Sequence, residues 1–272
     1  MFFKLILFLL FFYSYTFSGT RWGLPSKINI STYSIQDYSK TNSNNLPRSH
    51  KHKANFVKKI TSNINSKYSQ IKTSHILDRL DSSVTKSQIQ KDNLSHSEFA
   101  LFVGHGNKSG FYTYDGKFLS AGDKKFGNST YWVIFDACLV LNNDLPVLGK
   151  WFSGVHAILG NKSQGWQYIR SYNCFFNCNH YRSEDEYAYF AKYFISNGET
   201  IWESYKKAVK KAIYSQGNLG IEPAIVYKIG KADNGVETDM SEERFQNVYN
   251  APFNPASHTI VIKSIKYGKP KY

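Results

Sequence analysis

The sequence predicts an α/β fold with a mainly parallel central sheet. Apolar runs of strand length recur along the chain, at residues 99–103, 131–135, 154–159, 224–229 and 259–263. Strands of a parallel sheet are buried on both faces, so they read as unbroken apolar runs rather than alternating ones. Well-marked helices occupy residues 183–197 and 200–216. A chain of 272 residues can bury such a sheet in one domain without disulfide crosslinks.

Further elements are predicted before the first of these apolar runs. Residues 28–35 alternate and are rich in β-branched side chains, which predicts a strand. The polar residues 41–53 predict a loop. Apolar side chains recur every fourth residue across 54–68, at Phe56, Ile60, Ile64 and Tyr68, which predicts a helix with one apolar stripe. A short strand is expected at residues 74–77.

The two later helices carry start and stop signals. Each opens with a capping box and stops at a glycine: Ser183, Glu186 and Gly198 in the first, Thr200, Glu203 and Gly217 in the second. Residues 19–272 are therefore interpreted as a single α/β domain, in which 231–272 form a C-terminal excursion from the main fold.

The N-terminus predicts export. Residues 1–18 combine Lys4 with an apolar run from Leu5 to Tyr13, and Ser18 is a small residue before the expected cleavage point. This composition is typical of a signal peptide, with an uncleaved anchor as the alternative. No later segment is long and apolar enough to span a bilayer. We expect a secreted or cell-surface protein with no membrane span after removal of residues 1–18.

Charge and cysteine content narrow the class of protein. The chain has 34 Lys and Arg against 20 Asp and Glu, a formal charge of +14, and 3 cysteines. Three cysteines exclude a disulfide-built scaffold and a cysteine-rich zinc module. No glycine-rich phosphate loop or interleaved arginine and aromatic motif accompanies the basic charge, so a nucleic-acid partner is not expected. The charge is interpreted as a solvated basic surface, with lysines at residues 51–59 and 206–211.

Two apolar strands end in reactive side chains. His105, between Gly104 and Gly106, follows the strand at 99–103, and Cys138 follows the strand at 131–135. Binding sites of open parallel sheets lie beyond the carboxyl ends of the strands. If the strands are neighbours, a thiol nucleophile and an imidazole base meet at one edge. The backbone amides of Gly106 and Cys138 could then form an oxyanion hole.

The segments Phe102-Val-Gly-His-Gly106 and Val133-Ile-Phe-Asp-Ala-Cys138 resemble the clan CD cysteine peptidases, the group of caspases, gingipains, legumains and clostripain. The resemblance is closest to uncharacterised secreted prokaryotic members. It implies a caspase-like αβα sandwich and a dyad that cleaves peptide bonds, with His105 as base, Cys138 as nucleophile and Gly106 as an oxyanion contributor. It covers roughly residues 28–230, although its motifs lie between about 85 and 165.

The chain departs from the caspases in specific ways. The caspase motif Q-A-C-[RQG]-G is absent, Leu139 follows the cysteine, and the histidine lies closer than the usual ~50 residues upstream. Cleavage after aspartate is therefore not carried over. Gln164 and Trp166, in the loop after the strand at 154–159, are possible substrate-binding residues because of their position alone.

Several other residues allow more than one interpretation. Cys174 and Cys178 are predicted to form a disulfide; two thiols, or a zinc site with His180, are the alternatives. His156 is interpreted as a core residue, and Asp136 as either a cap or a group that orients a neighbour. The proposed chemistry needs no metal or organic cofactor.

The sequence thus predicts a secreted cysteine endopeptidase acting on a protein or peptide substrate, in an oligomeric state that the sequence leaves undefined. A catalytically weak caspase-fold binding module at the cell surface is the alternative, and a cysteine-dependent acyl transferase or amidase is a third. A binding module has no need of both His105 and Cys138 at adjacent strand ends.

Overall fold

The computed structural model describes the chain from residue 25 to residue 268 with gaps. The described ranges are 25–41, 43–92, 94, 96–126, 130–164, 168–170, 180–213, 220–232, 235–248 and 253–268. Several sequence predictions lie outside them: the signal peptide at 1–18, the possible substrate contact Trp166, the pair Cys174 and Cys178, and the helix stop at Gly217.

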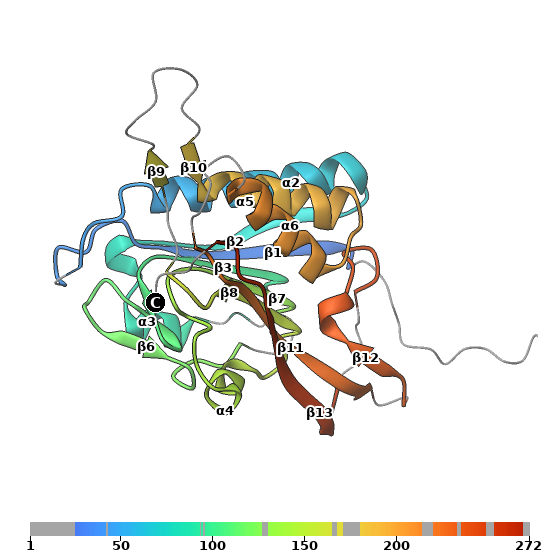
Figure 1. Ribbon diagram of the computed structural model, residues 1–272. Coiled ribbons are helices and arrows are strands. Elements are labelled where there is room, and N and C mark those ends of the chain that lie inside the picture. The colour runs from blue at the N-terminus through green and yellow to red at the C-terminus, as the bar shows by residue number, and fades with distance from the viewer. Residues whose placement is uncertain are drawn as a thin grey trace, which may run out of the picture.

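An eight-stranded sheet forms the centre of the molecule (Figure 1). Its parallel strands run in the order β2-β1-β3-β7-β8, and β11 is antiparallel to β8. The predicted α/β class with a mainly parallel sheet is confirmed. The strand bounds are Lys27–Ser34 (β1), Lys72–Leu80 (β2), Phe99–Val103 (β3), Trp132–Asp136 (β7), Ala157–Asn161 (β8) and Pro223–Ala232 (β11).

Residues from the predicted C-terminal excursion complete this sheet. Both β12 (Glu237–Asp239) and β13 (Phe253–Ser264) pair antiparallel with β11. The 3₁₀ turn η4 (Met240–Glu242) follows β12 directly. The segment after residue 231 therefore adds strands to the same sheet that carries β3 and β7.

Different layers cover the two faces of the sheet (Figure 1). One face packs against helices α2 (Ser49–Lys67), α5 (Ser183–Ala191), its π-helical continuation η3 (Lys192–Ser196), and α6 (Ile201–Ile213). The other is covered by short elements, namely η1 (Asp81–Ser83), α3 (Lys86–Lys91), α4 (Leu145–Leu148), η2 (Gly149–Trp151) and a small sheet of β4 (Gly106–Asn107), β5 (Gly110–Tyr112) and β6 (Phe118–Ser120). A separate ribbon pairs β9 (Tyr168–Arg170) with β10 (His180–Arg182).

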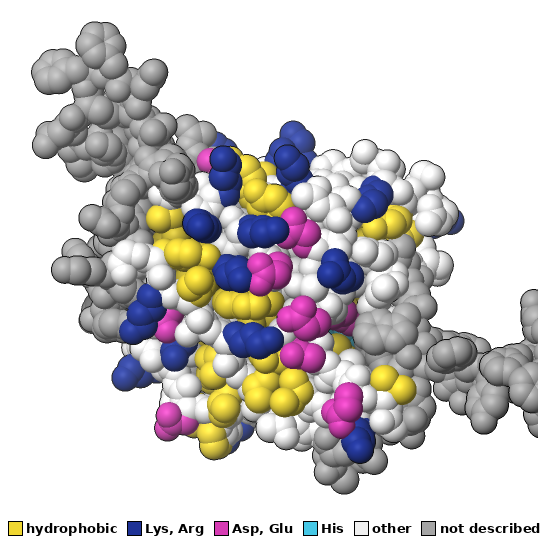
Figure 2. Space-filling view, turned by 45° about the vertical axis from the view of Figure 1, so that its right-hand side comes forward, with side chains coloured by type: hydrophobic (Ala, Val, Ile, Leu, Met, Phe, Trp, Pro, Cys, Tyr) yellow, Lys and Arg dark blue, Asp and Glu magenta, His cyan; other side chains and the backbone are white. Residues whose placement is uncertain are grey.

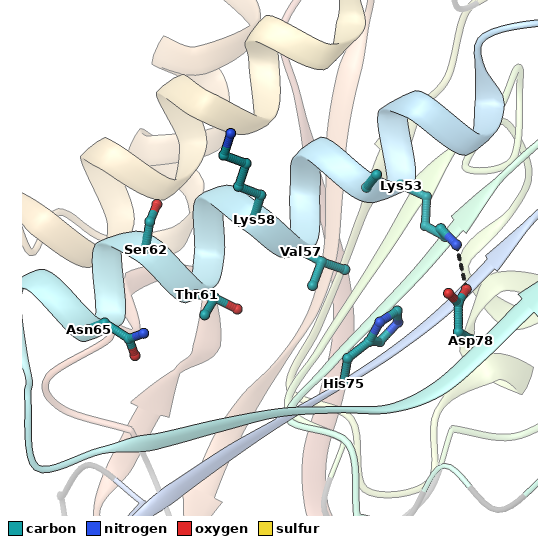
Figure 3. Close-up of a pocket in the computed structure, with 9 residues that line it drawn as sticks. Lys53, Val57, Lys58, Thr61, Ser62, Asn65, His75 and Asp78 are labelled. Atoms are coloured by element: carbon teal, nitrogen blue, oxygen red, sulfur yellow. Dashed lines mark hydrogen bonds and ion pairs between the residues drawn. The ribbon is translucent and has the colours of Figure 1, made fainter.

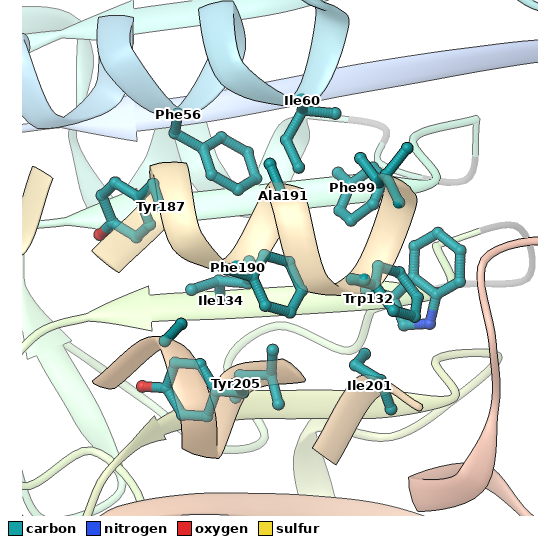
Figure 4. Packing of buried hydrophobic residues seen from close by; sticks show 14 of the residues in the cluster. Phe56, Ile60, Phe99, Trp132, Ile134, Tyr187, Phe190, Ala191, Ile201 and Tyr205 are labelled. Atoms are coloured by element: carbon teal, nitrogen blue, oxygen red, sulfur yellow. The ribbon is translucent and has the colours of Figure 1, made fainter. Parts of the chain in front are cut away.

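Aromatic side chains fill the space between the sheet and the helical layer. Phe56 of α2 and Phe190 of α5 point toward the strands that carry Phe99 and Trp132 (Figure 4). The rings of Phe99 and Trp132 lie 4.6 Å apart between centroids. The Phe56 and Phe99 rings meet edge to face with centroids 6.1 Å apart. Edge-to-face aromatic pairs add stability beyond the area that they bury. The high aromatic content of the sequence is thus used in the core between the layers.

The first long helix starts earlier than predicted. The sequence predicted a loop over 41–53, but α2 begins at Ser49, and the loop prediction is wrong for its last residues. The reason is that polar side chains extend the buried face of the helix. His52 and Lys53 are both buried, His52 bonded to Asp136 and Lys53 paired with Asp78. Apolar periodicity cannot detect a helical turn whose buried side chains are polar.

Two predicted strands are shifted in the structure. The run at 154–159 forms a strand only from Ala157, and that strand continues to Asn161. The short strand expected at 74–77 is longer and occupies Lys72–Leu80.

A buried polar cluster ties the C-terminal segment to the sheet. Glu243 is 1% exposed, and its carboxylate accepts hydrogen bonds from the Trp132 indole N–H and from the His156 imidazole, at 2.7 and 2.9 Å. The ring of Tyr131 stacks on His156. A buried carboxylate is tolerated when such partners satisfy it. His156 is therefore a hydrogen-bonded core residue, as the sequence indicated.

The basic charge is distributed among acidic side chains. On α6, Lys206 pairs with Glu203 and Lys207 with Glu199. Figure 2 shows Lys and Arg side chains interspersed with Asp and Glu over one face of the molecule. A mixed surface of this kind disperses the positive potential, whereas polyanion-binding proteins concentrate it in one patch or stripe.

One lysine is buried inside the sheet. Lys228 of β11 is 4% exposed, and its ammonium group donates to the Ser153 carbonyl at 2.9 Å. Burial lowers the pKa of Lys228 to about 8. Between that value and about 10.4, the ordinary lysine pKa, the unfolded chain holds a proton that the folded chain has lost. Folding stability therefore rises with pH across this interval.

We predict that Lys228→Met removes this pH dependence. Between pH 8 and pH 10, urea unfolding should show wild type gaining about 2 kcal/mol of stability relative to the variant. Taking the difference between the two proteins cancels the titration of groups that they share. A difference that stays constant over this range would contradict the burial of a titrating Lys228 amine.

Candidate functional site

The site begins with two neighbouring parallel strands. Strands β3 and β7 pair in register, with Val103 opposite Asp136. His105 and Cys138 each follow two positions beyond that pair, at the carboxyl end of their strand. Neighbouring strands lie about 4.8 Å apart, so the two turns start side by side. The structure thus meets the condition on which the predicted dyad depended, that these two strands are neighbours.

Gly106 brings the two turns into direct contact. A Cβ atom at this position would lie 2.4 Å from the Cys138 carbonyl oxygen and 2.7 Å from Cγ2 of Val140. No side chain fits in that space, so the turn after His105 can pack on the turn around Cys138 only because residue 106 is glycine. The structure therefore brings together His105, Gly106 and Cys138, which were predicted from three separate positions in the sequence.

Backbone contacts on the far side hold the Cys138 turn. Leu139 has a left-handed backbone, with a φ of 57°, and its N–H donates to the Ser163 carbonyl at 2.9 Å. The Leu141 N–H donates to the Asn161 carbonyl at the end of β8. Cys138 itself is half-buried and forms no disulfide with any described residue. Strand β8 thus supports its turn from one side, while Gly106 contacts it from the other.

A backbone carbonyl orients the His105 ring. Nε2 of His105 lies 2.6 Å from the carbonyl oxygen of Asn44, in the connection between β1 and α2. A carbonyl oxygen can only accept, so Nε2 must carry the hydrogen. In the neutral ring the lone pair is then on Nδ1, which is the atom able to take a proton. Asn44 was not predicted to take part, because a backbone contact leaves no mark on the sequence.

Tyr38 contacts the same histidine through a hydrogen bond and a ring contact. The His105 backbone N–H donates to the Tyr38 phenol oxygen at 2.8 Å, and the two rings meet edge to face with centroids 4.5 Å apart. Burial raises the pKa of Tyr38, so the phenol stays protonated at physiological pH. A Cβ atom at Gly104 would lie 2.4 Å from the Tyr38 oxygen, so the glycine before His105 makes room for this contact.

The strand pairing after His105 directs the amide of Gly106. The Tyr112 N–H donates to the His105 carbonyl at 3.0 Å, so these residues occupy a hydrogen-bonded position of the ladder, while the His105 N–H donates to Tyr38 instead. Hydrogen-bonded and non-hydrogen-bonded pairs alternate along an antiparallel ladder. Gly106 and Phe111 form the next pair, so the Gly106 N–H points away from β5.

Asp136 connects the end of β7 to the helical layer. Its carboxylate accepts a hydrogen bond from Nδ1 of His52 on α2, at 2.9 Å, and His52 is fully buried. Burial, together with the nearby Asp136 carboxylate, raises the pKa of Tyr187 on α5. Of the two roles that the sequence allowed for Asp136, a cap or an orienting group, the structure supports the second, because its carboxylate orients the His52 ring. His52 lay within the predicted loop and was missed.

Gln164 is the one predicted substrate contact within the described residues. It is exposed and follows the end of β8 by three positions. Its neighbour Ser163 is buried and accepts from the Leu139 amide through its carbonyl. Gln164 therefore lies on the connection that also supports the Cys138 turn.

A separate groove of about 540 Å³ runs between α2 and β2 (Figure 3). At one end Lys53 pairs with Asp78. Beside it the His75 ring bonds to the Thr32 hydroxyl at 2.8 Å. These contacts fix the edge strand β2 beneath the helix. The groove contains none of the residues that the sequence predicted for the chemistry.

Metal-binding clusters and membrane-spanning helices can be judged for the described residues only. In those ranges, no three His, Cys, Asp or Glu side chains are grouped so that they could hold a metal ion. Nor does any helix in the same part of the chain have the length and apolar character needed to cross a membrane.

Comparisons with known proteins give a family and likenesses to solved structures. The chain is similar to the crystal structure of the Arg-specific cysteine proteinase gingipain R, with 10% identity and a TM-score of 0.45. The match covers 88% of this chain and 66% of that one, slightly under two thirds of its length. At so low a TM-score the likeness carries no argument about the activity of this chain. No curated protein matches the chain. The family model described as "Domain of unknown function (DUF6345)" matches residues 32–256, and the chain belongs to this family.

Proposed function

We propose that the protein is a cysteine hydrolase that cleaves peptide bonds, with Cys138 as nucleophile and His105 as base. The observation that carries the proposal is the Asn44 carbonyl bonded to Nε2 of His105. This bond leaves Nδ1 as the basic atom, on a ring whose turn packs against the turn of the only cysteine among the described residues.

The proposed reaction has two stages. The Cys138 thiol gives its proton to Nδ1 of His105, and the sulfur attacks the carbonyl carbon of the peptide bond. The carbon–nitrogen bond then breaks, and the imidazolium returns the proton to the leaving amine. Water, deprotonated by the same imidazole, hydrolyses the resulting thioester and restores the thiol.

Negative charge on the attacked oxygen needs hydrogen-bond donors in place beforehand. We assign this role to the backbone amides of Gly106 and Cys138. The support is that ladder alternation turns the Gly106 N–H away from β5, while the absent side chain allows close approach. Loss of a single oxyanion donor typically lowers kcat by about 10²- to 10³-fold.

The substrate class we propose is a protein or peptide. Gln164 and Trp166 are the proposed wall of the substrate site, since Gln164 is exposed on the connection beside the Cys138 turn. The proposed chemistry is carried by side chains and backbone amides, without a metal or organic cofactor.

We further propose that the protein acts outside the cytoplasm. The support is the signal-peptide composition of residues 1–18. N-terminal sequencing of the exported full-length gene product tests this, and the expected first residue is Gly19. Recovery of the protein only in the cytoplasm, beginning at Met1, would contradict it.

We predict that peptide cleavage depends on both members of the dyad. In a peptide-library assay, Cys138→Ala should abolish cleavage, and His105→Ala should lower its rate by about 10²- to 10⁴-fold, the usual contribution of a general base. His96→Ala is the matched control. His96 is exposed and precedes β3 in the sequence, whereas His105 follows β3. Cleavage that survives Cys138→Ala would sink the peptidase proposal. A folded protein that cleaves no peptide but binds one would favour the surface binding module.

We also predict that Gly106→Ala disables Cys138 without removing a functional group. The new methyl group would overlap the Cys138 carbonyl and displace one turn from the other. Alkylation of Cys138 by iodoacetamide at pH 7, followed by peptide mass mapping, should slow at least tenfold, toward the rate of an ordinary thiol. Gly149→Ala is the control, because a Cβ atom there has its nearest neighbour at 3.8 Å. Equal rates in the two variants would contradict the role given to the turn contact.

A further inference from the structure

One short connection supplies the hydrogen bond to the His105 ring and the one to its backbone N–H. Tyr38 accepts the His105 backbone N–H, and the Asn44 carbonyl accepts from Nε2. Both residues belong to the segment between β1 and α2, which we call the β1–α2 connection; its described residues are 35–41 and 43–48. Asn44 is exposed to solvent. The orientation of the imidazole therefore depends on what holds this connection in place.

The connection is braced internally. The Leu46 N–H donates to the Gln36 carbonyl at 2.9 Å, which closes the segment at its base. The Tyr38 N–H donates to the side-chain oxygen of Asn45 at 2.7 Å. Tyr38 and Asn44 are thus linked through one compact loop. A displacement at the base of this loop would move both contacts to His105 together.

Asp81 holds that base from outside. One oxygen of its carboxylate accepts the backbone N–H groups of Gln36 and Asp37, at 2.7 and 3.0 Å. The other oxygen lies 2.7 Å from Nε2 of His50 at the start of α2. The Nδ1 atom of His50 in turn bonds the buried hydroxyl of Ser34, at 2.8 Å. A single carboxylate therefore fixes the point where the connection leaves β1 and the helix where it ends.

Asp81 itself adopts an unusual backbone conformation. Its φ is 37°, in the left-handed region that asparagine and aspartate enter more readily than most residues and glycine most readily of all. Although partial burial opposes ionisation, the amides of Asp37 and Gln36 and the His50 ring hold the pKa of Asp81 below its ordinary value. The group is thus a carboxylate at neutral pH, as an acceptor of these three bonds must be.

We infer that Asp81 is a positioning residue for His105, acting through the β1–α2 connection. The inference rests on the proposed function, since it assigns a part in that chemistry to a residue that touches neither Cys138 nor substrate. The chain of contacts runs from the Asp81 carboxylate to the Gln36 and Asp37 amides, and from there to Tyr38 and Asn44 and the His105 ring.

Two substitutions at position 81 separate the carboxylate from the backbone conformation. Both Asp81→Asn and Asp81→Gly tolerate a positive φ, but only asparagine keeps an oxygen that accepts from the two amides. The measurement is the pH profile of Cys138 alkylation by iodoacetamide in the full chain, read by peptide mass mapping. His105→Ala defines the profile of an unassisted thiol, whose pKa is near 8.5.

We expect Asp81→Gly to slow alkylation at pH 7 about tenfold and to move the profile toward that of His105→Ala, because the thiol loses a correctly placed imidazole. Asp81→Asn should stay within about threefold of wild type. His50→Ala leaves position 81 intact and should shift the profile in the same direction as Asp81→Gly. It serves as the test if Asp81→Gly does not fold.

A remote aspartate provides the matched control. Asp239 of β12 also accepts from a backbone amide and a hydroxyl, both of Ser241. Asp239→Gly should leave the Cys138 profile unchanged.

The outcomes separate the inference from the proposed function. If His105→Ala shifts the profile but folded Asp81→Gly and His50→Ala do not, the positioning role is wrong and the dyad stands. If wild type and His105→Ala give the same profile, the dyad itself is wrong, and the inference fails with it.

Discussion

The in-register pairing of β3 with β7 is the constraint on which the rest of the site depends. Because Val103 lies opposite Asp136, both strands end at the same level, and the residues beyond them form adjacent turns. A slip by one residue would exchange the faces of a strand whose residues are all buried, so the aromatic core enforces the register. Gly106 then allows the two turns to touch.

Pairing of strands alone does not orient an imidazole. The ring of His105 takes its direction from Asn44 and Tyr38, which reach it from a connection fixed at the far side of β1. The carboxylate of Asp136, bonded to His52, joins the same sheet edge to α2. Rigid strands place the reacting groups, and hydrogen bonds from loops and a helix set the orientation of the side chains at this edge. Efficient catalysis requires that reacting groups are held in the correct geometry.

Sequence patterns predicted the elements that depend on local composition. The apolar runs ending at Val103 and in front of Asp136 are strands, and they are the neighbours that the predicted dyad required. The start of α2 was missed because His52 is a polar residue in a buried position. Asn44, Tyr38 and Asp81 were missed for another reason: they act on distant residues through a backbone carbonyl, a phenol oxygen and backbone amides, and none of these contacts has a local pattern.

The most direct measurement concerns the tautomer of the His105 ring. Long-range proton–nitrogen NMR of the Cys138→Ala protein, at a pH where the imidazole is neutral, identifies the nitrogen that carries the hydrogen. The bond to the Asn44 carbonyl predicts a hydrogen on Nε2 and a lone pair on Nδ1. A hydrogen on Nδ1, or an even mixture of the two forms, would contradict the proposed base and the orientation on which the site depends.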